Sequence, residues 1–266
     1  LLPSLNKNIY LKSNVNYENS NATYTGLTEW SFENDPKFNP KEHDNFKIFR
    51  ASFDIIQSER LSSVLSRNTT AYKSYFDRRW WRENDIFILA SDLGEENPSA
   101  ANYYDPYDLV RIGNGQDRFG ILRTFYVAGY EQSYNLKHLL FGNRSVLEIG
   151  GRIYWERFID DKKQGSAPDS RDGIYFIPAA SDEESPIIVG QSHHYETMAF
   201  SGFISESIDF GNLNLRPGLR FEIFEQERVD RLSGSTYLDK TSSVILPGFG
   251  FISKIGDFSV FGGIHR

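Results

Sequence analysis

The chain has 266 residues, of which 39% are hydrophobic and 15% aromatic, and its formal net charge is -7 at pH 7. Because it contains no cysteine, disulfides and thiolate metal sites are excluded, and the acidic balance argues against nucleic acid as the main partner. No stretch approaches the roughly 20 apolar residues of a transmembrane helix, and the mean hydropathy is -0.48. A membrane β-barrel has low mean hydropathy too, because lipid-facing residues alternate with lumen-facing ones. Composition alone therefore leaves a transmembrane barrel and an aromatic-rich β-sandwich as alternatives.

Two-residue periodicity predicts β-strands along the whole chain. Strands are expected at 8–17, 46–56, 61–76, 118–134, 143–158, 194–208, from 213 onward, 244–253 and from 258 to the chain end. No long window shows the 3.6-residue periodicity of a helix. The sequence therefore predicts an all-β chain of about nine strands.

The segment 143–158 shows the alternation most clearly. One face carries Leu147, Ile149, Gly151, Ile153 and Trp155. The other face carries Glu148, Gly150, Arg152, Tyr154 and Glu156. The charged face must contact water or residues of opposite charge. The apolar face must be covered by an apolar layer along its whole length. This strand is longer than the usual five or six residues, and its length suits a tilted membrane strand of roughly 9–11 residues.

Long and short connections alternate along the chain. Long polar segments follow residue 17 and occupy 77–117 and 160–191, and a shorter one surrounds 232–241. Tighter connections are expected around 58–59, 135–142, 209–212 and 254–257. This alternation is typical of an up-and-down transmembrane barrel with long outer loops and short periplasmic turns. Because bare sheet edges are not viable in lipid, these strands are expected to be a contiguous part of a larger barrel.

Several short motifs resemble one family in order and spacing. They are YTGLTE at 24–29, NPKEHD at 39–44, YFDRRWWR at 75–82, RTFYVAGYE at 123–131, RPGLRFE at 216–222, LPGFG at 246–250 and FGGIHR at 261–266. Together they resemble the TonB-dependent outer-membrane receptors and, within them, the ferric citrate (dicitrate) receptor-like group.

The resemblance implies a 22-stranded barrel, a plug domain N-terminal to it, and energy supplied through TonB. It also implies a Gram-negative-type outer membrane, contact with its lipid, and transport of a ferric chelate, without a resident cofactor or an enzymatic activity. The chain departs from the family pattern because no plug sequence precedes residue 1 and the remaining strands are absent. We therefore expect 1–266 to be part of the barrel domain. The alternatives are a receptor for a different siderophore, a passive porin or a barrel enzyme.

Arginines on the predicted loop 77–117 and its roots are candidates for substrate binding. A citrate chelate of iron is an anion, and a guanidinium group binds carboxylates in a bidentate manner. The candidate arginines are Arg78, Arg79, Arg82, Arg111 and Arg118. The side chains expected to wall the pocket are Trp80, Trp81, Tyr103 and Tyr104. In the alternative interpretation, the tryptophans belong to an interfacial belt and the arginines are solvated or contact lipid phosphates.

A second set of charged residues is expected to face the lumen. It comprises Glu148, Arg152, Glu156, Arg216, Arg220 and Glu222. Such residues either contact substrate and plug or form a network of paired charges, since buried charges persist when they are paired. Adjacent His193 and His194 are expected on opposite faces of a strand, which argues against a shared metal site. No catalytic motif is recognisable.

Overall fold

The structure is a computed structural model that describes residues 6–21, 26–39, 41, 43–83, 86–93, 107, 109–112, 118–165, 173–175 and 190–266. Nine strands form one antiparallel sheet, in the order β1 (Lys7–Ser20), β2 (Asn45–Arg60), β3 (Leu65–Glu83), β6 (Arg118–Leu140), β7 (Asn143–Gly165), β8 (Gln191–Asp209), β9 (Leu213–Asp230), β10 (Thr236–Ile255) and β11 (Phe258–His265). A second sheet pairs β4 (Ile86–Leu89) with β5 (Leu109–Ile112). The short helices are α1 (Glu29–Asn34) and the 3-10 helix η1 (Ala90–Leu93).

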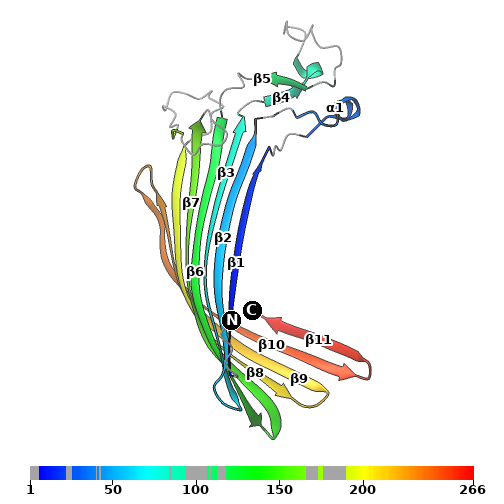
Figure 1. The fold of residues 1–266 in the computed structure, drawn as a ribbon, viewed down its shortest axis with the longest axis vertical. Helices are drawn as coiled ribbons and strands as arrows, with labels where there is room; N and C mark the ends of the chain where they lie inside the picture. The colour runs from blue at the N-terminus through cyan, green and yellow to red at the C-terminus, as the bar shows by residue number, and fades with distance from the viewer. Residues whose placement is uncertain are drawn as a thin grey trace.

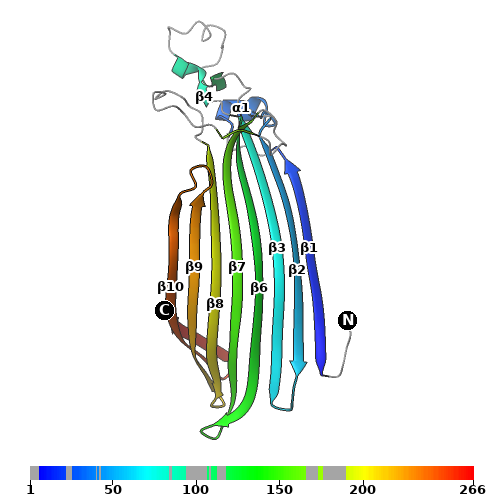
Figure 2. The same cartoon turned by 90° about the vertical axis from the view of Figure 1, so that its left-hand side faces the viewer.

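The large sheet is an up-and-down meander, because every strand pairs with its neighbours in chain order apart from the separate β4–β5 sheet. Figures 1 and 2 show a curved sheet whose upper ends lead to α1, β4 and β5 and whose lower ends are joined by hairpins. The predicted nine-stranded antiparallel meander is therefore confirmed. Among the described residues, no helix is both long enough and apolar enough to cross a membrane.

The strands are longer than predicted. Both β6 and β7 contain 23 residues, which corresponds to about 75 Å at 3.3 Å per residue. The predicted loop 77–117 is wrong at its start, because β3 continues to Glu83. The predicted polar segment 232–241 is also wrong, because β10 already begins at Thr236. In both places charged or polar residues and large apolar ones occur on each face, so the two-residue alternation ends before the strand does.

The connection between β6 and β7 is a two-residue turn rather than the eight-residue segment 135–142. Phe141 and Gly142 both have positive φ, at 52° and 81°. Two consecutive left-handed residues are typical of a type I′ hairpin turn, whose twist matches that of the flanking strands. This turn places the strand residues of β6 and β7 in register from Leu140 and Asn143 upward.

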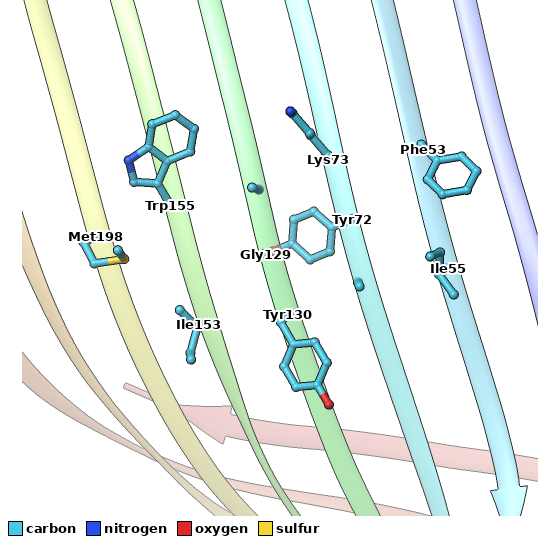
Figure 3. A pocket seen from close by; sticks show the side chains of 11 residues that line it. Phe53, Ile55, Tyr72, Lys73, Gly129, Tyr130, Ile153, Trp155 and Met198 are labelled. Carbon is cyan, nitrogen blue, oxygen red and sulfur yellow. The ribbon is translucent and has the colours of Figure 1, made fainter.

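Register and alternation divide the side chains of the sheet between an outer and an inner face. Ile153, on the outer face, lies opposite Tyr130 on β6 and Phe200 on β8. Figure 3 views the outer face, with β11 passing behind the strands, so this face is the convex one. Ile153 is 52% exposed and Phe200 is 49% exposed. The inner face carries the opposite parity, which includes Arg152 between Glu131 and Ser201.

Aromatic rings of one strand cover glycines of the next at several places. Trp81 lies over Gly120, and a Cβ atom at Gly120 would be 3.0 Å from its ring. A Cβ at Gly150 would be 2.5 Å from the ring of Phe203 and 2.8 Å from the carbonyl oxygen of Gln132. The rings occupy the space above glycines, which have no side chain. Such ring–glycine contacts favour one register of the paired strands.

Candidate functional site

The upper part of β3 separates the predicted binding residues by face. Arg78, Trp80 and Arg82 lie on the inner face, where they pair across the strands with Arg123, Ile121 and Phe119 of β6, respectively. Arg79 and Trp81 point to the outer face, because successive side chains of a strand alternate. These five residues are thus strand residues divided between two surfaces, and their assignment to substrate binding stays a prediction.

The three inner-face residues Arg78, Trp80 and Arg82, together with Phe119 of β6, form a compact group that we call the upper arginine cluster. The guanidinium carbon of Arg82 lies 5.2 Å from the Trp80 ring centroid and 5.4 Å from that of Phe119. The guanidinium carbon of Arg78 lies 6.0 Å from the Trp80 ring. These are cation–π distances. These contacts hold both guanidinium groups beside aromatic rings, and the planar guanidinium geometry matches that of a carboxylate.

A neighbouring arginine on β6 is neutralised by a carboxylate. The Arg123 Nε donates to Asp160 Oδ1 at 2.8 Å, and Gln191 Nε2 donates to Asp160 Oδ2 at 3.0 Å. Asp160 is 7% exposed. Both carboxylate oxygens of Asp160 therefore accept hydrogen bonds. These bonds hold the side chains of Arg123 and Gln191 on the inner face, beside the upper arginine cluster.

A row of stacked rings crosses the inner face below the cluster. Phe125 stacks on Phe158 with a centroid distance of 4.3 Å and an interplanar angle of 11°. The row continues to Phe76 on one side at 5.7 Å and to Tyr195 on the other at 5.2 Å. We call Phe76, Phe125, Phe158 and Tyr195 the aromatic ladder. Rings that stack along the row present their edges to the interior, so the ladder is a rigid apolar shelf.

Arginines cover both ends of the aromatic ladder. The Arg50 guanidinium lies 4.8 Å from the Phe76 ring, and that of Arg228 lies 5.4 Å from the Tyr195 ring. Arg228 is also 5.1 Å from the ring of Tyr237, and its Nη2 is 3.1 Å from His193 Nδ1. Cationic groups therefore occupy the terminal ring faces of the ladder.

The outer-face members of the predicted site pack into the structure. Arg79 pairs with Asp77 at 3.2 Å, and Thr124 donates to the same carboxylate at 3.1 Å. Trp81 has no exposed surface. The Trp81 ring is fully covered by the chain itself, and the assignment of Trp81 to a pocket wall stays a prediction.

Arg118 also belongs to a buried group at the top of the outer face. Its Nη1 donates to the carbonyl oxygen of His43 at 3.1 Å and lies 3.9 Å from Glu83 Oε1. The Lys41 ammonium donates to the Glu83 carbonyl at 3.0 Å, and the Glu83 amide donates to Asp44 at 2.8 Å. These bonds attach the segment before β2 to the tops of β3 and β6.

Three predicted residues have no described side-chain position. Tyr103 and Tyr104 lie outside the described residues. The backbone of Arg111 belongs to β5, where it pairs with Phe87 of β4. Their assignment to substrate binding stays a prediction.

All six predicted lumen charges lie on the inner face. Arg220 forms an ion pair with Glu222, and it also donates to Ser201 at 3.2 Å. Tyr154 donates to Glu156, and the Arg152 guanidinium lies 5.5 Å from the Tyr154 ring. Within the part of the chain that the structure describes, Glu148 and Arg216 form no ion pair. The interactions are thus local pairs rather than one continuous network.

The two adjacent histidines point to opposite faces as predicted. His193 contacts Arg228 on the inner face, whereas His194 Nε2 lies 3.6 Å from Glu196 Oε2 on the outer face. Among the described residues, no group of three His, Asp or Glu side chains is placed to hold a metal ion.

Sequence reasoning missed Phe119, Arg123 and the aromatic ladder as parts of the candidate site. The sequence of each strand shows which of these side chains share a face. Their proximity to Arg78 and Arg82 depends on the pairing of β3 with β6, which joins residues about 40 positions apart.

A long antiparallel meander with an apolar convex face and a charged concave face is part of a transmembrane β-barrel. The family model described as "TonB dependent receptor-like, beta-barrel" matches residues 3–266, and the chain belongs to this family.

Solved structures show the same fold. The ferric citrate transporter FecA in the unliganded form matches with a TM-score of 0.71 at 15% identity, over 99% of this chain and 34% of that one. The ferric-catecholate import receptor Fiu from E. coli K12, in its open form, matches with a TM-score of 0.62 at 11% identity, over 96% and 43%. BauA, the ferric preacinetobactin receptor from Acinetobacter baumannii, matches with a TM-score of 0.61 at 12% identity, over 98% and 37%. The chain thus spans less than half the length of each. Curated protein sequences gave no match.

Proposed function

We propose that the chain forms part of the barrel of an outer-membrane receptor for TonB-dependent uptake of an anionic ferric chelate, with ferric citrate as the leading candidate. The observation that carries this proposal is the upper arginine cluster on the inner face, where Arg78 and Arg82 flank the ring of Trp80. The outer face contacts lipid, and the ferric chelate is cargo rather than a resident cofactor.

The geometry of the cluster suits an anion that bears several carboxylates. Arg78 and Arg82 lie on one face of β3, four residues apart, which separates their Cα atoms by about 13 Å. A hydrogen bond to a charged group contributes about 1.5–3 kcal/mol. Two arginines that each form two hydrogen bonds with a carboxylate would contribute about 6–12 kcal/mol, which offsets much of the roughly 4–15 kcal/mol cost of association.

The relatives are named for chemically different ligands, so the shared fold does not select a substrate. The arginines favour a carboxylate chelate. The aromatic ladder favours a second candidate, a siderophore with aromatic groups, because ring edges at Phe125 and Phe158 form an apolar shelf below the arginines. Both candidates use the same surface and differ in which residues supply affinity.

In the proposed mechanism, the chelate binds to the outer loops and the inner face of the barrel. Closure of the loops then removes the bound anion from bulk water, which strengthens its interaction with the arginines. Rearrangement of a plug domain, driven through TonB, opens the path to the periplasm. The chain itself supplies the binding face in this sequence.

The proposal is tested by titrating the full-length protein in detergent with gallium citrate, a redox-silent substitute for the ferric complex, and with the gallium complex of a catecholate. Trp80 is the reporter, because its ring lies between the two arginines, and a Trp80→Phe variant isolates its signal. A saturable change with citrate alone supports the leading candidate, and a response to the catecholate alone supports the aromatic siderophore. Iron uptake by cells with and without TonB distinguishes a receptor from a passive porin: uptake that persists undiminished without TonB contradicts the receptor assignment.

A further inference from the structure

The outer face contains a shallow apolar depression over β2, β3, β6, β7 and β8, with a volume of about 450 Å³. Small residues make it hollow. Ala71 lies between Ile55 and Tyr130 of the neighbouring strands, and Ala128 lies between Lys73 and Trp155. Figure 3 shows Tyr130 and Ile153 on the near face, with Trp155 and Met198 at one side and Phe53 and Ile55 at the other. The depression therefore lies within the band that faces the hydrocarbon of a membrane.

Lys73 lines the same depression, although its neighbours are apolar. It lies opposite Phe53 on β2 and Ala128 on β6. Its side chain is exposed, and within the described residues it forms no ion pair or hydrogen bond. A lysine on the lipid face of a barrel is destabilising near the bilayer midplane and much less so near the interface. Its charge therefore requires a partner from outside the chain or access to the interface.

The lysine is long enough to reach the interface. Tyr75 is the next residue of β3 whose side chain lies on the outer face. Its ring lies 5.2 Å from that of Tyr126. Tyrosines of this kind mark the level of lipid headgroups. The distance between outward neighbours on a strand is about 7 Å, which a lysine side chain spans. In Figure 3 the Lys73 ammonium points away from Tyr130 and Ile55, along β3 toward its upper end.

From this geometry we propose that the depression is a lipid-binding site, in which one acyl chain of an anionic, phosphate-bearing lipid fills the hollow and its phosphate binds the Lys73 ammonium. The apolar lining fits a hydrocarbon chain, and the single cation at its upper side fits one phosphate. The inference goes beyond the proposed transport function and does not depend on the identity of the chelate.

A second copy of the chain is a poorer occupant. A two-fold interface through this face would bring the two Lys73 ammonium groups toward one another, because both copies present the same patch. The like charges would repel in a medium of low dielectric constant. An anionic lipid instead supplies the opposite charge and the apolar volume together.

The test is quenching of Trp155 by lipids with brominated acyl chains, titrated into the full-length protein in detergent micelles. Trp155 lines the depression, and subtraction of the signal of a Trp155→Phe variant isolates it. Phosphatidylglycerol is the anionic probe and phosphatidylcholine the neutral one. We expect half-maximal quenching at an about fivefold lower concentration of the anionic lipid, as one lysine near a membrane surface provides.

Variants separate the contribution of the Lys73 charge from that of the hollow that holds the acyl chain. Lys73→Met should abolish the preference for the anionic lipid, and Lys73→Arg should retain it. Lys47→Met is the matched control, since Lys47 is an outer-face lysine that lies 6.0 Å from the Tyr17 ring, outside the depression. Ala128→Phe fills the hollow and should abolish quenching by both lipids.

The proposal is overturned if the wild-type protein shows no preference, if Lys73→Met keeps it, or if Ala128→Phe leaves quenching unchanged. A change of oligomeric state in Lys73→Met, with lipid preference retained, would favour a protein partner instead and also overturn it. Gallium citrate binding should be the same in Lys73→Met and wild type, so failure of the lipid site is distinguishable from failure of the transport function. Loss of folding is not expected, because Lys73→Met removes a charge from the apolar band.

Discussion

Alternation along β3 predicts that neighbouring arginines differ sharply in their effect on chelate binding. Arg78→Ala and Arg82→Ala each remove a guanidinium group from the inner face, whereas Arg79→Ala removes one from the outer face, where it pairs with Asp77. All three variants make the same chemical change within five residues of one strand. Arg79→Ala is therefore a matched control for local charge and stability.

The magnitude follows from the bonds that are lost. A hydrogen bond to a charged group contributes about 1.5–3 kcal/mol, and 1.4 kcal/mol corresponds to a tenfold change in affinity. Arg78→Ala and Arg82→Ala should thus each raise the Kd for gallium citrate about 10- to 100-fold. Arg79→Ala should change it less than about threefold, because the Arg79 guanidinium lies on the outer face and does not reach a chelate on the inner face.

The assay is the titration of Trp80 fluorescence in the full-length protein, repeated by isothermal calorimetry because the substitutions alter the surroundings of the reporter. Circular dichroism verifies that each variant retains its strand content. If Arg79→Ala weakens binding as much as Arg82→Ala does, the alternation argument is refuted. If none of the three changes the Kd, the cluster does not bind citrate.

Three further predictions concern stability. Gly150→Ala should lower the free energy of unfolding by about 1–3 kcal/mol, because the new Cβ would lie 2.8 Å from a backbone carbonyl oxygen. Gly202→Ala is the control and should be nearly neutral, because no atom lies within 4 Å of a Cβ there. Equal unfolding curves in urea for the two variants would contradict this prediction. A double-mutant cycle of Phe125→Leu and Phe158→Leu should give a coupling energy of about 0.5–1.5 kcal/mol, and purely additive effects would show that the stack contributes nothing beyond buried area. At the turn beyond the apolar band of β9, the backbone amide of Leu232 donates a hydrogen bond to Asp230 Oδ1 at 2.8 Å, and this bond lowers the pKa of Asp230. A lowered folded-state pKa means that the stabilisation is present above the unfolded pKa of about 3.9 and is lost as the pH falls through the folded value. Protection of the amides in this turn, relative to their intrinsic exchange rates, should therefore fall at low pH. An Asp230→Asn variant should lack that fall, and the same fall in the variant would refute the assignment.

The sequence alone determined the two faces of the sheet. In 143–158, apolar residues alternate with charged ones, and this local pattern predicts an apolar and a charged surface wherever the strand pairs. The family motifs and the up-and-down order of the strands were also readable, because adjacent strands of a meander are adjacent in sequence. The opposite orientations of His193 and His194 followed from the same alternation.

Only the tertiary structure decided where the strands end and which residues meet across them. Above the apolar band, charged residues and a tryptophan occupy each face of β3, so the apolar–polar alternation disappears. The pairing nevertheless continues to Trp81 with β2 and to Glu83 with β6. Arg78 and Arg79 therefore looked like loop residues, although the strand separates them. The proximity of Arg82 to Phe119 depends on the register between β3 and β6, and register is a non-local property, because one residue of slippage would exchange the two faces.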